Sequence, residues 1–148
     1  MMWLLEILAG VPLTRKSRDV ILQTMVTGRT QVETHEFLSW SVSQNTEKSG
    51  ALLAAQAIFL GVNSFALGRG WPRPLTIGSL ILLLAATLLL MSNLRTSWWS
   101  RHAASSDWRD AQQQIFDRVM SRSLRFNIAL YLTFLSIILL GIAALSVS

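Results

Sequence analysis

Three long apolar runs dominate the pattern of hydrophobic and polar positions. Residues 51–67, 75–94 and 126–147 contain no charged side chain. A helix rises about 1.5 Å per residue, so about 20 apolar residues cross the roughly 30 Å hydrocarbon core of a bilayer. Each run therefore predicts a transmembrane helix. The heptapeptide GRGWPRP at 68–74 holds two Gly and two Pro, which end helices, and predicts a tight hairpin between the first two spans.

The segments outside the runs also have a helical pattern. Between residues 17 and 49 Gly28 is the strong breaker, so we expect two helices meeting near it, with a strand over 19–26 as the alternative. In the segment 95–125 the residues Ser105 to Asp107 supply N-cap side chains. Apolar residues then recur at helical spacing, which predicts an amphipathic helix running into the third span: Trp108, Ala111, Ile115, Val119 and Phe126.

These elements predict an all-α membrane protein with three transmembrane helices and additional cytoplasmic amphipathic helices, assembled as an oligomer. We divide it into N-terminal helices over 1–49, a transmembrane hairpin over 50–94, a basic amphipathic helix over 95–125 and a third span over 126–148. The apolar stretch Met1 to Leu13 is too short to span. Basic residues follow it rather than precede it, so we do not expect a cleavable signal peptide. It is either an interfacial anchor or a plug for a pore.

Composition agrees with a membrane location. The chain is 51% hydrophobic and 14% charged, whereas soluble domains carry about 25% charged residues. With no Cys there is no disulfide, thiolate nucleophile or Cys-ligated metal. The two histidines lie far apart in the sequence, and no zinc-protease, serine-hydrolase or P-loop motif is present. We therefore expect no enzyme, no catalytic residue, no metal and no cofactor.

The positive charge predicts the topology. Of the 13 Lys and Arg, eleven lie in the segments 1–49 and 95–125 and two lie in the hairpin tip. Three spans put those two segments on the same side of the membrane. The positive-inside rule then places the N-terminus in the cytoplasm and the C-terminus outside.

The first span carries two distinct lines of residues. Gln56 and Asn63 form a polar line, and amides cannot remain unsatisfied in lipid, so they either pack against other helices of the protomer or line a pore between subunits. The leucine-rich second and third spans are expected to face lipid. A seam of small residues in the first span permits close approach of another helix: Ala57, Gly61, Ser64 and Gly68.

Three arginines form a second candidate site. Arg118, Arg122 and Arg125 recur at spacings of four and three, on one face of the amphipathic helix. Guanidinium groups bind phosphate, and nearby Trp98, Trp99 and Trp108 offer surfaces on which a base can stack. The alternative ligand is an anionic lipid head group. Lys48 at the mouth of the first span is a candidate further phosphate contact.

The stretch NTEKSGALLAAQA at 45–57 resembles the junction before the first span of Pycsar-type transmembrane effectors. Lys48 and the small residues after it match, whereas Thr46 stands where that pattern has Asp, and Glu47 is the nearest substitute. The hairpin, basic helix and third span over about residues 36–146 are similar to that family, to SLATT effectors and to Hailong-type channel effectors. The resemblance implies a bacterial antiphage effector that oligomerises, responds to a nucleotide or oligonucleotide signal and damages the inner membrane.

We therefore expect a pore-forming effector of the bacterial inner membrane, a homo-oligomer for which four subunits is the preferred number. Two alternatives remain: a non-channel assembly or anchoring subunit of a membrane complex, and a holin or toxin that acts without a ligand.

Overall fold

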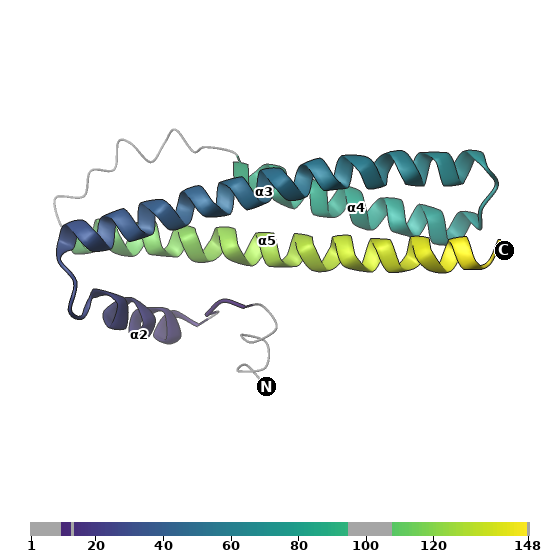
Figure 1. Ribbon diagram of the computed structural model, residues 1–148. Coiled ribbons are helices and arrows are strands. Elements are labelled where there is room, and N and C mark those ends of the chain that lie inside the picture. The colour runs from purple at the N-terminus through teal and green to yellow at the C-terminus, as the bar shows by residue number, and fades with distance from the viewer. Residues whose placement is uncertain (1–9, 13, 95–107, 148) are drawn as a thin grey trace. The chain divides into compact units, whose positions relative to one another are not determined.

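The computed structural model describes residues 10–12, 14–94 and 108–147. In chain order its helices are α2 (Arg15–Val26), α3 (Gln31–Gly68), α4 (Arg73–Leu94) and α5 (Trp108–Leu145) (Figure 1). The last three contain 38, 22 and 38 residues, and each is long and apolar enough to cross a membrane. The prediction of an all-helical chain with three candidate spans is confirmed. Most of residues 1–13 and all of 95–107 lie outside the described residues, as do the expectations made for them.

Local hydrogen bonds explain where α2 and α3 begin. The Thr14 hydroxyl accepts from the backbone N–H three residues on and caps α2. Gly28 has φ +84°, a left-handed conformation that favours glycine, and it turns the chain. Thr30 and Glu33 then form a reciprocal capping box at the start of α3, with bonds of 3.3 and 2.8 Å. The two helices meet as predicted near Gly28, and the strand alternative for 19–26 is wrong.

The turn between α3 and α4 is closed by backbone hydrogen bonds. Gly70, with φ +77°, donates its N–H to Leu67 O, and Trp71 donates to Ala66 O at 3.2 Å. This pair of bonds is the Schellman arrangement, which satisfies carbonyls at a helix end. Four residues of GRGWPRP thus separate the two helices, as expected from its Gly and Pro content.

The chain divides into two compact units, and α3 and α5 contribute to both. The N-terminal unit comprises Met1–Glu47 and Arg95–Leu124, and the span unit comprises Lys48–Leu94 and Arg125–Ser148. The boundary between the two units therefore falls within α3 and within α5 rather than at a loop. We describe each unit by itself.

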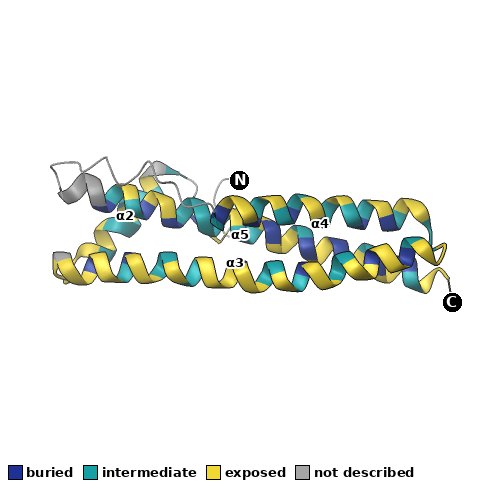
Figure 2. Cartoon of the chain, turned by 90° about the horizontal axis from the view of Figure 1, so that it is seen from above, coloured by how far each residue is buried: buried dark blue, intermediate teal, exposed yellow. Residues whose placement is uncertain are grey.

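In the span unit three helices pack with coiled-coil spacing. The buried residues of α4 alternate three and four apart, the pattern of a helix whose one stripe faces its partners (Figure 2). Ala86 and Leu90 of α4 form a core with Ala129 of α5, and Leu52 and Leu53 of α3 are among the residues packed on it. The full buried set on α4 is Thr76, Ser79, Leu83, Ala86, Leu90 and Asn93.

The N-terminal unit has a small core of large apolar side chains. Leu38, Phe116 and Val119 are its main buried residues. Arg18 of α2 contacts Asp117 of α5 at 3.3 Å and donates through Nε to a backbone carbonyl at 3.0 Å. The ion pair is partly exposed, so its contribution to stability is small compared with that of the core.

Candidate membrane-embedded site and basic face

A hydrogen-bonded amide lies inside the span unit and joins its three helices. Gln56 of α3 is 1% exposed. Its Nε2 donates to Thr133 Oγ1 of α5 at 2.6 Å, and Thr87 Oγ1 of α4 donates to its Oε1 at 2.8 Å. Such contacts between helices each contribute about 0.6 kcal/mol on average in a membrane bundle. Gln56 therefore contacts both other helices of its own protomer.

A second polar contact holds α4 against α5. The Ser79 and Ser136 hydroxyls lie 2.8 Å apart. Each also donates toward the other residue's backbone carbonyl, over 3.0 and 2.9 Å. This reciprocal geometry requires the two backbones to approach closely, which small residues permit.

Asn63 lies seven residues after Gln56 and is fully buried. Its Nδ2 donates to Phe59 O at 3.0 Å, and among the described residues nothing meets its Oδ1. Ser49, seven residues before Gln56, is likewise buried, and among those residues no group bonds to its hydroxyl. The polar line thus faces the interior of the protomer. Packing within the protomer and lining of a pore both remain predictions for this line.

The small-residue seam lies on the exposed side of α3. Ala57, Gly61, Ser64 and Gly68 are all exposed, and Ser64 donates its hydroxyl to its own helix, to Leu60 O at 2.9 Å. A Cβ added at Gly61 or Gly68 would meet nothing within 4 Å. The seam is therefore open to close approach by another helix.

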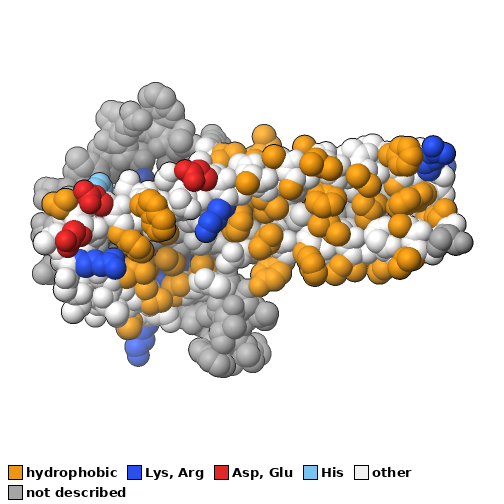
Figure 3. All heavy atoms as spheres, in the orientation of Figure 1, with side chains coloured by type: hydrophobic (Ala, Val, Ile, Leu, Met, Phe, Trp, Pro, Cys, Tyr) orange, Lys and Arg blue, Asp and Glu red, His pale blue; other side chains and the backbone are white. Residues whose placement is uncertain are grey.

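The rest of the surface of the span unit is strongly apolar. On the face seen in Figure 3, hydrophobic side chains cover its helices. Large side chains that would be buried in a soluble domain are exposed on all three helices, which is the distribution expected of a protein in lipid. Examples are Ile58, Phe65, Ile81, Leu84, Leu88, Phe134 and Ile138.

The second and third spans do more than face lipid, contrary to our expectation. Their buried stripes carry hydroxyl and amide side chains that hydropathy does not identify, namely Thr76, Ser79 and Asn93. Of these, Ser79 bonds to Ser136 of α5, and Thr76 donates to Pro72 O. The three-and-four spacing of these residues with Leu83 and Leu90 is the signal that identifies them. The mean hydropathy of these helices does not reveal the buried polar residues, because a few polar side chains among many apolar ones hardly lower that mean.

The three arginines lie on α5, away from its buried stripe. Arg118 and Arg125 are exposed and Arg122 is half-buried with an interaction of its own, whereas Phe116 and Val119 are buried. Helical spacing places the arginines on one face. Arg118 and Arg122 belong to the N-terminal unit, and Arg125 and the exposed Lys48 belong to the span unit. The side chains of Trp98, Trp99 and Trp108 lie outside the described part of the chain.

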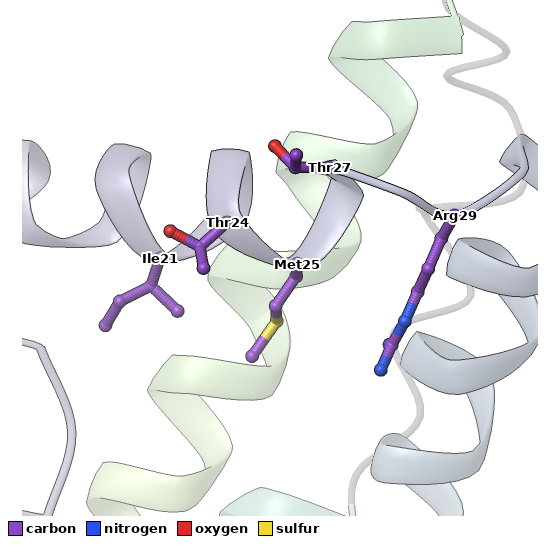
Figure 4. A pocket seen from close by; sticks show the side chains of 5 residues that line it. All are labelled: Ile21, Thr24, Met25, Thr27 and Arg29. Atoms are coloured by element: carbon purple, nitrogen blue, oxygen red, sulfur yellow. The ribbon is translucent and has the colours of Figure 1, made fainter.

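A hollow of about 410 Å³ lies beside α2 in the N-terminal unit. Ile21, Thr24 and Met25 line it from the helix, and Thr27 and Arg29 from the segment that follows (Figure 4). The Arg29 guanidinium lies 4.9 Å from the centre of the Phe37 ring, so this side chain already makes a cation–π contact. Within the described residues no group of three or more His, Cys, Asp or Glu is placed to hold a metal ion.

Comparison with protein-family models, curated proteins and solved structures finds no match for this chain. Its architecture combines three helices able to span a membrane, a surface of large apolar side chains and buried polar groups that form hydrogen bonds. Together these support a membrane protein.

Proposed function

We propose that this chain is an effector of the bacterial inner membrane that assembles through the α3 seam into an oligomeric pore, with four subunits as the preferred number. The N-terminus lies in the cytoplasm and the C-terminus outside. The observation that carries the proposal is the seam itself, because Ala57, Gly61, Ser64 and Gly68 leave one side of α3 exposed and without bulk. Membrane helices associate closely along such surfaces.

A pore requires several copies because the interior of one protomer is filled. Leu83, Ala86 and Leu90 of α4 are fully buried in it, and Gln56 is engaged by the two neighbouring helices. A path for water therefore has to form between protomers. The seam is the surface of α3 that is free to bring protomers together.

The proposed signal carries phosphate and acts on the arginine face of α5. Arg118 and Arg125 are exposed, and guanidinium groups form charge-assisted bonds with phosphate. Arg122 and Lys48 complete the predicted set. The resemblance to Pycsar-type and Hailong-type effectors supports a nucleotide or oligonucleotide as this signal and antiphage defence as its setting. A signal shifts the pore only through its different affinities for the two states.

A second candidate is a non-channel anchoring or assembly subunit. One observation favours it: Gln56 has hydrogen-bond partners inside its own protomer. A polar residue with partners inside its own protomer stabilises the helix bundle, so its presence in a span is explained without a pore. This candidate predicts a protein that leaves membranes intact when it is present alone.

The two candidates are separated by Gly61→Leu in liposomes loaded with a fluorescent dye. The matched control is Gly141→Leu on α5, an exposed glycine at which a Cβ also meets nothing within 4 Å. We expect dye release and an oligomer by native mass spectrometry for the wild type and the control, and loss of both for Gly61→Leu. Absence of release by the wild type both with and without added nucleotide would favour the anchoring subunit. Release by all three proteins would show that the seam is not the contact.

Control by phosphate is tested by replacing Arg118 and Arg122 with Glu. The double variant should lose its response to added nucleotide, giving constant release if the signal closes the pore and none if it opens it. Release that never depends on nucleotide, in either protein, would indicate a holin or toxin. Dye release that depends on anionic lipid but not on nucleotide, and that loses this dependence in the double variant, would show that these arginines bind lipid head groups.

A further inference from the structure

The hairpin tip of the span unit, residues 68–74, carries two cations that nothing in the unit neutralises. Arg69 follows α3, Arg73 begins α4, and both residues are exposed. The span unit contains no Asp or Glu. Among the described residues neither guanidinium group donates a hydrogen bond or forms an ion pair. Each arginine therefore keeps its five N–H donors for a ligand.

A large apolar side chain lies one helical turn inward from each of these arginines. Phe65 of α3, before Arg69, is 58% exposed, and Ile77 of α4, after Arg73, is 45% exposed. The Arg69 guanidinium lies 5.1 Å from the centre of the Phe65 ring, which is a cation–π contact. On the face seen in Figure 3, basic side chains lie at the end of the apolar surface. The tip thus places cations directly beyond exposed apolar groups, as a surface that meets both acyl chains and head groups requires.

The length of α3 sets the depth of the tip. The helix has no charged residue between Lys48 and Arg69. At about 1.5 Å per residue it rises about 32 Å over this stretch, close to the roughly 30 Å of a hydrocarbon core. The stretch is therefore long enough for Lys48 and Arg69 to reach the head groups of opposite leaflets. Trp71, half-buried in the turn, is of a residue type enriched at that interface.

We propose that the hairpin tip binds the phosphate groups of anionic phospholipids in the leaflet that it reaches. Arg69 and Arg73 donate charge-assisted hydrogen bonds to the phosphate oxygens, and Phe65 and Ile77 contact the acyl chains. A zwitterionic lipid binds less strongly, because its own ammonium group neutralises its phosphate and the tip supplies only positive charge. The proposal requires a span unit that lies in a membrane, and it requires neither a pore nor a nucleotide signal.

The test measures which lipids lie beside the tip, using the full chain in liposomes. Pro74→Cys, at an exposed position of the tip, introduces a single cysteine that can carry a bimane fluorophore. Spin-labelled phosphatidylglycerol or spin-labelled phosphatidylcholine, at equal mole fraction, quenches this fluorophore when it binds nearby. We expect phosphatidylglycerol to bind the tip more strongly than phosphatidylcholine, by about fivefold for each arginine.

In this background Arg69→Gln and Arg73→Gln should each lower that preference by about fivefold, and together they should abolish it. Replacing both arginines by Lys keeps the charge and should keep most of the preference. The matched control is Arg29→Gln, because Arg29 makes the same kind of contact, with Phe37, in the N-terminal unit. It should keep the full preference.

Three results would overturn the proposal. The first is equal quenching by the two lipids in the Pro74→Cys protein. The second is quenching by neither lipid, which would place the tip away from the head groups. The third is an unchanged preference in both single Gln variants, each of which retains one arginine and so needs only a small change to the fold.

Discussion

The two units differ in where they place their large apolar side chains. In the N-terminal unit the large side chains Leu38, Phe116 and Val119 are buried, although Val32 and Trp40 are exposed. In the span unit side chains such as Leu88 and Phe134 are exposed, while hydroxyl and amide groups lie inside. Lipid permits the arrangement in the span unit, because lipid gives no advantage to burying a leucine.

One helix shows the change along its own length. The buried residues of α5 lie three and four apart from Gln112 to Val119 and again from Ala129 to Ala143, and none of the residues between Val119 and Ala129 is buried. The buried residues change from Phe116 and Val119 to Ala129 and Thr133. The spacing of the buried residues is therefore the same in the two units, whereas the side chains at the buried positions differ.

The largest expected effect is that of removing a buried ring from the N-terminal unit. Phe116 is 1% exposed and Phe134, on the same helix, is 63% exposed. We expect Phe116→Ala to cost about 3–5 kcal/mol through lost burial and a cavity. Phe134→Ala should cost far less because its ring leaves lipid rather than a core. Denaturant unfolding in detergent, followed by tryptophan fluorescence, measures both, and equal costs would contradict the distinction.

The next effect compares two exposed positions in the two units. Ile81 of α4 is 60% exposed and Val20 of α2 is 56% exposed. Ile81→Asp should disfavour insertion by about 2.5–3.5 kcal/mol, because it places a charge in hydrocarbon. Val20→Asp should change stability by no more than about 0.5 kcal/mol. The membrane-inserted fraction after carbonate extraction is the readout, and an unaffected Ile81→Asp would show that α4 does not meet lipid there.

Overpacking the small interior of the span unit has an intermediate effect. Ala86 is fully buried, whereas Ala54 of α3 is exposed. We expect Ala86→Leu to cost about 1–3 kcal/mol because the helices must separate to admit the added atoms. Ala54→Leu should leave the fold of the protomer unchanged. Thermal unfolding in detergent distinguishes them, and a stable Ala86→Leu would mean that the helices are not closely packed.

The smallest effect is that of one interior hydrogen bond. Thr133→Val removes the acceptor of Gln56 Nε2 while keeping the shape of the side chain. The expected cost is about 0.6 kcal/mol, and at most about 1.7 kcal/mol. Ser64→Ala, which removes a bond within α3 alone, is the control and should cost less. Steric trapping of unfolding in bicelles can resolve this difference, and no difference would mean that the Gln56 contact does not stabilise the bundle.

The sequence predicts the parts of the fold that depend on local signals. Uncharged runs indicate the spans, Gly28 the junction of two helices, and GRGWPRP the turn. The partners of Gln56 could not be predicted, because Thr87 and Thr133 are distant in the sequence and their meeting depends on how three helices pack.

The most direct test of the account is the side of the membrane on which each unit lies. The chain has no Cys, so single-cysteine variants report one position each. Arg69→Cys marks the exposed turn after α3, and Ser43→Cys marks an exposed position of the N-terminal unit. In intact cells an impermeant maleimide should label Arg69→Cys. It should label Ser43→Cys only after the membrane has been permeabilised. Labelling of Ser43→Cys in intact cells, or failure to label Arg69→Cys from outside, would contradict a span unit that crosses the membrane three times from a cytoplasmic N-terminus.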